Sequence, residues 1–201
     1  RGARQSEMKK RIIGVTGGIG NGKSAVARLL AEEYEAYVID ADKLGHAVLE
    51  EEGRDVVIAA FGDGIVGGDG HIMRGRLARE VFADPDKLRR LSAITQPLIM
   101  KRAARMILER DGLVVLEAAL LIEAGWQTLV DEVWVVACER EIRIRRIMER
   151  DGRGEKDAKR RIESQMSDED RIRFADVGID NSGSLDELKK TVKKVMMGGG
   201  H

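Results

Sequence analysis

Residues 17–24 read Gly-Gly-Ile-Gly-Asn-Gly-Lys-Ser and match the pattern G-x-x-x-x-G-K-[ST] at every fixed position. In such a stretch the glycines let the backbone curl, so that successive N–H groups point inward toward an anion. Lys23 is long enough to reach the β- and γ-phosphates of a nucleotide, and the Ser24 hydroxyl is placed to ligate Mg²⁺. The motif therefore predicts a phosphate-binding loop.

The flanks of this motif support the same interpretation. An apolar run at residues 11–16 precedes it, and a helical pattern at residues 25–33 follows it. A helix that starts here adds unpaired N–H groups and the positive end of its dipole. The alternative is a glycine-rich turn that a lysine happens to follow, but the order strand, turn, helix favours phosphate binding.

Two carboxylates follow the next apolar run, residues 36–40. Asp40 and Asp42 are two residues apart, so in an extended chain they share a face. A carboxylate within hydrogen-bond reach of an alcohol can orient it and accept its proton. We expect one carboxylate to act on a substrate hydroxyl, while the other caps the helix at residues 43–49 or holds Mg²⁺ through water.

Glu117 ends a third apolar run, residues 113–117. Three roles stay open for it: holding a substrate amine or hydroxyl, serving the metal shell, or capping a helix.

Residues 140–161 are rich in arginine and lysine and have a helical pattern. Two helices are expected to meet at the glycine-containing turn of residues 151–154. One interpretation is a solvated helical pair with ion pairs between successive turns. The other is a mobile lid that brings arginines onto phosphate, with Arg150 beside the turn as the foremost candidate.

The apolar runs are unbroken, which is typical of strands buried on both faces of a parallel sheet. Further runs are at residues 132–137 and, more weakly, 177–180. Because strands alternate with helices, we predict a doubly wound α/β sheet. Between Asp42 and Leu113 only helices and turns are expected, including helices at 74–82 and 87–109, the latter with Pro97 as a kink or break.

The composition excludes several classes of protein. Lys+Arg and Asp+Glu both number 35, which argues against general nucleic-acid or membrane-surface binding. No apolar run approaches the roughly 18 residues of a membrane span. Cys138, the single cysteine, ends an apolar run and is interpreted as a core residue. We expect a cytoplasmic protein that is a monomer or a weak homo-oligomer and that binds a small-molecule partner. Residues 1–7 and 198–201 are expected to be poorly ordered, and Met8 is the expected natural start.

Several of these stretches together resemble the dephospho-CoA kinase family. The resemblance covers nearly all of residues 11–195. The segments that carry it are residues 14–24, 38–42, 61–62, 69–70, 74–77, 81–82, 91–99, 117–123, 146–150, 161–162 with Gln165, 175–176 and 180–183. Many kinases share the phosphate loop, but the loop, Asp-Ala-Asp, arginine lid and Asn-x-Gly together are specific to this family.

The resemblance implies transfer of the γ-phosphoryl group of ATP, with Mg²⁺, to the ribose 3′-hydroxyl of dephospho-CoA. It implies one P-loop kinase domain over residues 8–197 with a five-stranded parallel sheet. The expected parts are a core of residues 8–53, 111–139 and 176–197, a helical CoA-binding subdomain of about 54–110, and a lid of about 140–175.

Roles for individual residues follow from the loop, the carboxylates and the resemblance. The catalytic residues are expected to be Asp42 as the base, Lys23 and Arg150. The expected nucleotide-binding residues are Gly18, Ile19, Gly20, Asn21, Gly22, Lys23, Ser24, Ala25, Asn181 and Gly183, the last two beside adenine. The expected acceptor-side residues are Asp42, Arg74, Gln96 and Glu117, and Ser24 is the expected metal ligand.

Three positions depart from the family pattern. Gln96 replaces the usual histidine and cannot be protonated. Ala25 replaces a hydroxyl residue, and Ala119 replaces a proline. Another P-loop kinase with a small hydroxyl or nucleotide substrate is the first alternative function. A nucleotide-binding switch is the second, although the chain shows no Asn-Lys-x-Asp guanine-specificity element.

Overall fold

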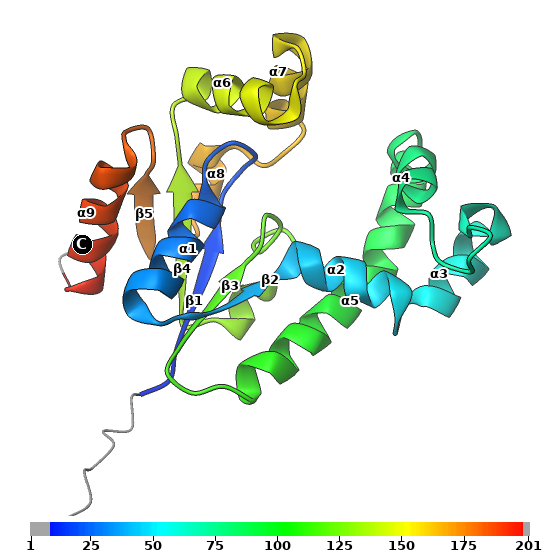
Figure 1. Cartoon of the computed structure of the whole chain (residues 1–201), viewed down its shortest axis with the longest axis horizontal. Helices are drawn as coiled ribbons and strands as arrows, with labels where there is room; N and C mark the ends of the chain where they lie inside the picture. The colour runs from blue at the N-terminus through cyan, green and yellow to red at the C-terminus, as the bar shows by residue number, and fades with distance from the viewer. Residues whose placement is uncertain (1–8, 199–201) are drawn as a thin grey trace, which may run out of the picture. The chain divides into compact units, whose positions relative to one another are not determined.

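Five parallel strands form the sheet of this protein, in the order β2-β3-β1-β4-β5 (Figure 1). The computed structural model describes residues 9–198, so the expectations for residues 1–7 and 199–201 lie outside the described residues. The strands are β1 Arg11–Thr16, β2 Tyr37–Asp40, β3 Leu113–Glu117, β4 Glu132–Ala137 and β5 Val177–Asp180. Each apolar run predicted as a strand forms one, and the predicted α/β class is confirmed.

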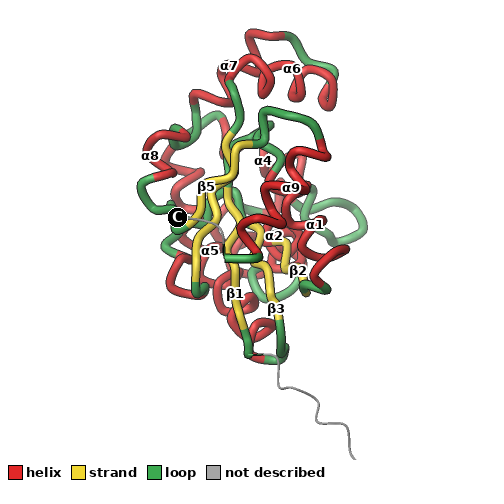
Figure 2. Tube along the Cα trace, turned by 90° about the vertical axis from the view of Figure 1, so that its left-hand side faces the viewer, coloured by secondary structure: helices red, strands yellow, loops and turns green. Residues whose placement is uncertain are grey.

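The central strands are buried on both faces, which explains their unbroken apolar runs. Residues 114–116 of β3, for example, are all fully buried. Helices α1 (Lys23–Tyr34) and α9 (Leu185–Met196) lie on one side of the strands, and the short α8 (Asp168–Ile172) lies on the other (Figure 2).

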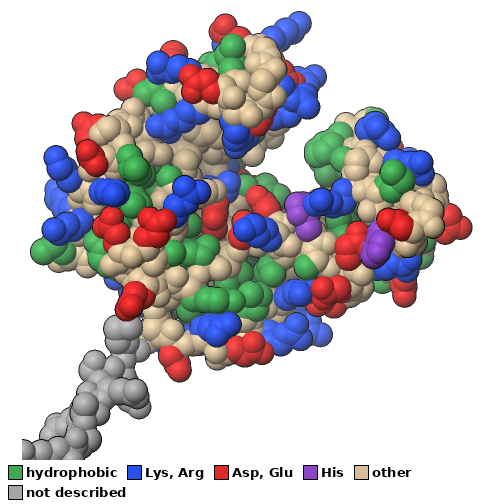
Figure 3. Space-filling model, viewed as in Figure 1, with side chains coloured by type: hydrophobic (Ala, Val, Ile, Leu, Met, Phe, Trp, Pro, Cys, Tyr) green, Lys and Arg blue, Asp and Glu red, His purple; other side chains and the backbone are tan. Residues whose placement is uncertain are grey.

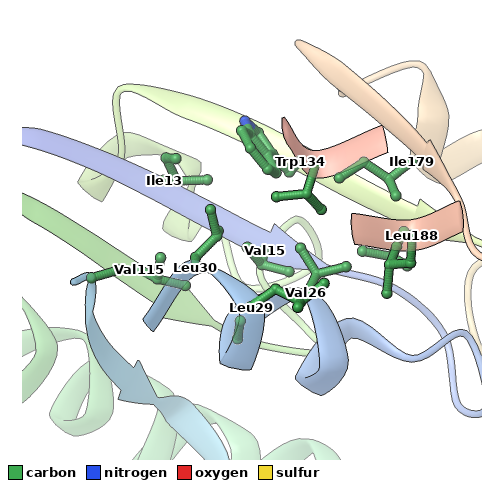
Figure 4. Packing of buried hydrophobic residues seen from close by; sticks show 13 residues of the cluster. Ile13, Val15, Val26, Leu29, Leu30, Val115, Trp134, Ile179 and Leu188 are labelled. Carbon is green, nitrogen blue, oxygen red and sulfur yellow. The ribbon is translucent and has the colours of Figure 1, made fainter. Parts of the chain in front are cut away.

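The core of this sheet packs around Trp134 of β4 (Figure 4). Val26 and Leu30 of α1 pack against the sheet in this core, and Leu188 of α9 joins them near Ile179 of β5. Burial of each such side chain contributes roughly 1.5–3 kcal/mol, so the core fixes α1, and with it the loop that precedes α1.

The described chain divides into two compact units, residues 9–39 with 107–198, and residues 40–106. The sequence led us to place residues 40–53 with the core, whereas α2 (Ala41–Glu50) clusters with the helical unit. No helix within residues 9–198 is both long and apolar enough to cross a membrane.

The helical unit has its own small core. Val57 of α3 (Arg54–Phe61) and Leu77 and Val81 of α4 (Arg74–Phe82) pack with Ile65 and Ile72 of the intervening turns. Helix α4 has the predicted bounds. Helix α5 (Pro85–Leu108) runs without a break through Pro97, where we expected a kink or break.

Two helices form the segment predicted as a lid, α6 (Arg140–Asp151) and α7 (Glu155–Glu163). Ile144 and Ile147 of α6 pack against Ala158 and Ile162 of α7 in a cluster of their own. Gly152, with φ of 63°, ends α6 in the left-handed region, which lets the chain reverse within a few residues. Basic side chains gather over both helices, with acidic side chains among them (Figure 3).

Candidate functional site

The phosphate loop of residues 17–24 presents several free backbone N–H groups. Gly20 and Gly22 have φ of 80° and 83°, the left-handed region that favours glycine. Among residues 9–198, the N–H groups of Gly20, Gly22, Lys23 and Ser24 find no hydrogen-bond acceptor. The N–H groups of Lys23 and Ser24 also open α1, where a helix leaves its first donors unpaired. The loop thus has the donor arrangement that binds phosphate oxygens.

Close packing explains why glycine occupies two of these positions. A Cβ on Gly22 would overlap the side-chain amide of Asn181. A Cβ on Gly17 would lie 2.6 Å from the Val136 carbonyl oxygen. The N–H of Ala25, a predicted ligand of the nucleotide, donates to the Gly22 carbonyl at 3.0 Å and thereby helps to start α1.

The two functional side chains of the motif differ in their partners. Lys23 Nζ has no hydrogen bond or ion pair within the described chain, so it is free to meet an incoming anion. The Ser24 hydroxyl donates a hydrogen bond to the carboxylate of Glu117, which is buried at the end of β3. Residues 118–125 form turns rather than a helix, so Glu117 caps no helix.

The Ser24–Glu117 pair offers the donors that Mg²⁺ prefers. Both side chains supply hard oxygen atoms, and Mg²⁺ in phosphoryl-transfer sites usually takes one or two carboxylates together with waters and phosphate oxygens. No group of three or more His, Cys, Asp or Glu within residues 9–198 is placed to hold a metal ion. The Ser24–Glu117 pair could supply two of the oxygen ligands of such an ion.

The first half of the loop is held by side chains from the segment after β4. The Ile19 N–H donates to Gln165 Oε1 at 2.8 Å, and the Ile19 carbonyl accepts from Arg143 Nε at 3.1 Å. Arg146 Nη1 lies 3.5 Å from the Gly20 carbonyl oxygen. These contacts leave the free donors of the second half of the loop untouched.

A partly buried carboxylate, that of Asp168, joins this segment to the side chain of Asn21. Asn21 is fully buried, and its Nδ2 donates to Asp168 Oδ1 at 2.9 Å. Arg143 Nη1 donates to the other Asp168 oxygen at 3.2 Å, and Arg171 Nη1 lies 3.4 Å from Oδ1. Burial lowers the pKa of the Arg143 guanidinium, and the Asp168 charge acts in the opposite direction.

The sequence interpretation assigned no role to Arg143, Gln165 or Asp168. A signal for Arg143 was present, because it shares the inward stripe of α6 with Ile144 and Ile147. An arginine in an apolar stripe needs a buried partner. Which carboxylate that partner is cannot be read from spacing.

Asn181 and Gly183 follow β5, and the structure gives them different surroundings. Asn181 is buried, and its Nδ2 donates to the Asn21 carbonyl at 2.9 Å. Its own carbonyl accepts from Arg146 Nη2 at 2.9 Å. Asn181 therefore acts on the loop, whereas Gly183 is exposed.

Arg150 lies at the end of α6 with its side chain exposed. Its Nε and Nη2 donate to the two oxygens of Asp151 at 2.7 and 3.0 Å. The hydrogen bond to Asp151 raises the pKa of Arg150, and the same bond lowers the pKa of Asp151. Arg161 of α7 also binds Asp151, at 2.7 Å, so this carboxylate links the two helices.

Cys138 follows β4 and is buried with a free thiol. Burial raises the pKa of this thiol, which makes it a weak nucleophile at neutral pH. Its assignment to the core is confirmed.

In the helical unit, the two carboxylates after β2 divide their work. Asp40 Oδ1 accepts from the backbone N–H groups of Asp42 and Lys43, at 2.9 and 3.2 Å, and caps α2. Asp42 lies in the first turn of α2 with an exposed side chain. Its carboxylate has no hydrogen-bond partner within residues 9–198, so it is available to a substrate.

The two expected acceptor-side residues lie on separate helices of the same unit. Arg74 is the first residue of α4, and its side chain is exposed and has no ion pair among the described residues. Gln96 lies half-buried in the middle of α5, next to Pro97.

Relatives are similar in sequence to this chain over nearly its full length. The family model described as dephospho-CoA kinase matches residues 11–187. The dephospho-CoA kinase of Geobacter sulfurreducens is 43% identical over 190 residues, covering 92% of this chain and 96% of the relative. That of Aquifex aeolicus is 43% identical over 192 residues, covering 91% and 94%.

Solved structures are similar to this chain over nearly its full length as well. A crystal structure of a Thermus thermophilus protein has a TM-score of 0.81 at 34% identity, covering 94% of this chain and 98% of the other. Dephospho-CoA kinase from Campylobacter jejuni has a TM-score of 0.69 at 27% identity, covering 92% and 95%. Shikimate kinase from Acinetobacter baumannii, 16% identical with a TM-score of 0.55, shares the fold. With a family model that matches residues 11–187 and this similarity to relatives over nearly their full length, the chain belongs to the dephospho-CoA kinase family.

Proposed function

We propose that residues 17–24 bind the phosphates of ATP and that Asp42 prepares the acceptor hydroxyl. The family transfers a phosphoryl group from ATP to dephospho-CoA, the final step of coenzyme A biosynthesis. The observation that carries the assignment is the set of four N–H groups in the loop and the first turn of α1 that have no acceptor among residues 9–198, beside a Lys23 side chain that has no partner there either.

Lys23 and Arg150 supply positive charge to the transferred group. As the γ-phosphoryl group moves, negative charge spreads over its oxygens, and fixed cations stabilise that charge. Lys23 stands on the rigid first turn of α1. Arg150 exchanges the Asp151 carboxylate for phosphate, and Asp151 keeps Arg161 as its partner.

Asp42 acts as the base. The ribose 3′-oxygen attacks the γ-phosphorus, the bond to the β,γ-bridging oxygen breaks, and the hydroxyl proton passes to the Asp42 carboxylate. Support comes from the division of labour at the end of β2, where Asp40 is occupied as the cap of α2 and Asp42 has no partner among the described residues.

Ser24 and Glu117 would hold Mg²⁺, Ser24 through its hydroxyl and Glu117 through its carboxylate or a bound water. When bound, the ion neutralises charge on the β- and γ-phosphates. Support comes from the oxygen donors of the pair and from the burial of Glu117.

The helical unit of residues 40–106 is proposed to bind dephospho-CoA, with Arg74 and Gln96 on the acceptor side. Arg74 offers a planar cation suited to phosphate. Gln96 offers a neutral donor and acceptor, so acceptor binding should not depend on protonation at this position. Gly183 is proposed to border the adenine of ATP, while Asn181 acts through the loop.

We also propose a cytoplasmic location and a monomer or weak homo-oligomer without nucleic acid. Cell fractionation tests the location, and light scattering over a range of protein concentrations tests the assembly.

The experiment is a coupled assay of ADP release with identification of coenzyme A as the product. Dephospho-CoA should be consumed together with ATP, whereas AMP, shikimate and cytidine nucleotides should not react. Lys23→Ala should lower kcat/KM by on the order of 100-fold or more. Lys190→Ala, an exposed lysine on α9, is the matched control and should behave as wild type. Turnover of another acceptor instead, or an unchanged Lys23→Ala enzyme, contradicts the proposal.

A further inference from the structure

The segment between α7 and β5 contacts the phosphate loop through two side chains, the amide of Gln165 and the carboxylate of Asp168. Asp168 accepts hydrogen bonds from Asn21 in the loop and from Arg143 on α6, and a third, longer one from Arg171 on its own helix. All these residues belong to one compact unit. We propose that Asp168 is a positioning residue that holds the phosphate loop in its anion-binding curl.

Burial makes these contacts consequential. The side chains of Arg143 and Arg171 are 7% and 1% exposed, and that of Asp168 is 21% exposed. A buried cation without a partner is strongly unfavourable, so both arginines hold the carboxylate in place. Arg171 Nη2 also lies 3.2 Å from Glu123 Oε1, which balances two cations with two carboxylates.

The side chain of Asn21 is the link from this network to the loop. It is fully buried, and its donor amide has Asp168 as its partner. Its backbone carbonyl accepts from Asn181, and its backbone N–H donates to Gly18. Three hydrogen bonds therefore hold Asn21 in place. The next residue is Gly22, whose N–H is one of the donors without an acceptor among residues 9–198, so these bonds also position that donor.

Asp168 lies in the first turn of α8, where a negative charge suits the helix dipole, and it pairs with Arg171 three positions later, but it does not cap the helix. Helix α8 is capped by Ser167, whose hydroxyl accepts from the Asp170 N–H. Next to Asp168, Glu169 is exposed and forms no ion pair within residues 9–198. Of these neighbours, the carboxylate of Asp168 is the one that reaches another segment of the chain.

Preorganisation gives this contact a measurable effect. A loop that is curled before the nucleotide arrives does not lose conformational entropy on binding, which favours affinity. Without Asp168, Asn21 would lose its partner and Arg143 would lose its counter-charge. The loop would then sample conformations in which its free N–H groups no longer converge.

The test is titration of the intact protein with ADP, a probe that needs no turnover. This inference rests on the proposed use of the loop for nucleotide. If wild type fails to bind ADP, the proposed function fails. If wild type binds ADP and the Asp168 variants bind equally well, this inference alone fails. We expect Asp168→Ala to weaken ADP binding by roughly 10-fold to 100-fold, the range for a lost charge-assisted hydrogen bond.

Asp168→Asn and Glu169→Gln complete the set. Asp168→Asn keeps the shape and an acceptor for Asn21 but loses the charge, so it should weaken binding less than Asp168→Ala. Circular dichroism shows whether Asp168→Ala folds. If it does not, the ADP affinity of Asp168→Asn tests the proposal in its place. Glu169→Gln removes the neighbouring exposed charge and should bind as wild type.

Two further readouts distinguish positioning from general stability. KM for ATP should rise in Asp168→Asn more than kcat falls, because the reacting groups are untouched. Asn21→Ala combined with Asp168→Ala should weaken binding by less than the product of the two single effects, because both remove one contact. Tighter ADP binding in Asp168→Asn would instead mean that Asp168 holds Arg143 away from the phosphates of the nucleotide. That result would overturn the proposal.

Discussion

The hydroxyl of Ser24 donates a hydrogen bond to the buried carboxylate of Glu117. This contact joins the first turn of α1 to the end of β3, two elements separated by 93 positions in the sequence. It gives Glu117, whose role the sequence left open, a place beside the residue that the motif assigns to the metal.

The first prediction concerns this pair. Glu117→Gln keeps the size of the side chain and its hydrogen-bond acceptor but removes the charge. We expect the Mg²⁺ concentration for half-maximal rate to rise by about 10-fold or more, because a carboxylate is the stronger ligand. The measurement is the initial rate against Mg²⁺ concentration. Glu109→Gln, at an exposed position after α5, is the control, and an unaltered Mg²⁺ dependence in Glu117→Gln would remove Glu117 from the metal site.

The second prediction separates the two carboxylates after β2. Asp42→Asn should lower kcat on the order of 100-fold or more with ATP affinity retained, because the amide cannot accept the proton. Asp40→Ala should instead lower the free energy of unfolding by about 1 kcal/mol, because it removes the cap of α2. Single-turnover rates and urea denaturation measure the two effects. Near-normal turnover of Asp42→Asn would count against Asp42 as the base.

The third prediction concerns the arginine at the end of α6. Arg150→Ala should lower kcat by on the order of 10-fold to 1,000-fold, because a cation on the transferred group is lost. Arg153→Ala is the matched control, since Arg153 is exposed and pairs with Asp157 at 3.6 Å. Steady-state kinetics compare the two variants. If kcat fell equally in both variants, Arg150 would have no particular role on the transferred group and would be one solvated charge among several.

The fourth prediction concerns pH and the helical unit. His71 Nδ1 lies 3.0 Å from Glu50 Oε2, and this hydrogen bond is the main cause of the raised pKa of His71. A pKa above the unfolded value of about 6.5 stabilises the fold below that pH, and the effect disappears as pH rises through the folded pKa. His71→Gln should therefore be less stable than wild type at pH 5.5 and equally stable at pH 8.5. The difference should shrink in high salt, because the pair is exposed.

The sequence predicted the parts of the site that depend on local order along the chain. The phosphate loop, the strand before it and α1 form one continuous stretch, and their geometry follows from the glycines and the apolar pattern. The three central strands β1, β3 and β4 were predictable for a similar reason, since burial on both faces requires unbroken apolar runs. The fold class followed from their alternation with helices.

The contacts that hold the loop were not predictable in this way. Asn21 and Asp168 are 147 positions apart, and no spacing rule connects them. Asn181 illustrates the same limit, because its amide donates to the backbone carbonyl of Asn21, 160 positions away in the sequence. Pro97 shows a different limit. A kink or a break was expected at this proline, and the break does not occur, because α5 continues through this position.

The last prediction uses two glycines in the left-handed region. Gly22 and Gly152 have φ of 83° and 63°, so an alanine at either position strains the backbone by roughly 1–2 kcal/mol. At Gly152 a Cβ would meet no atom of residues 9–198 within 4 Å, whereas at Gly22 it would overlap the Asn181 amide. Both variants should lose similar stability from the backbone, but Gly22→Ala should also lose ADP binding by 100-fold or more, on the order expected when donors at a phosphate site are displaced. Because both variants have the same backbone strain, the difference in their ADP affinities measures the effect of the close packing at Gly22. If Gly22→Ala bound ADP as tightly as Gly152→Ala, the curl of the loop would not depend on the approach of Asn181.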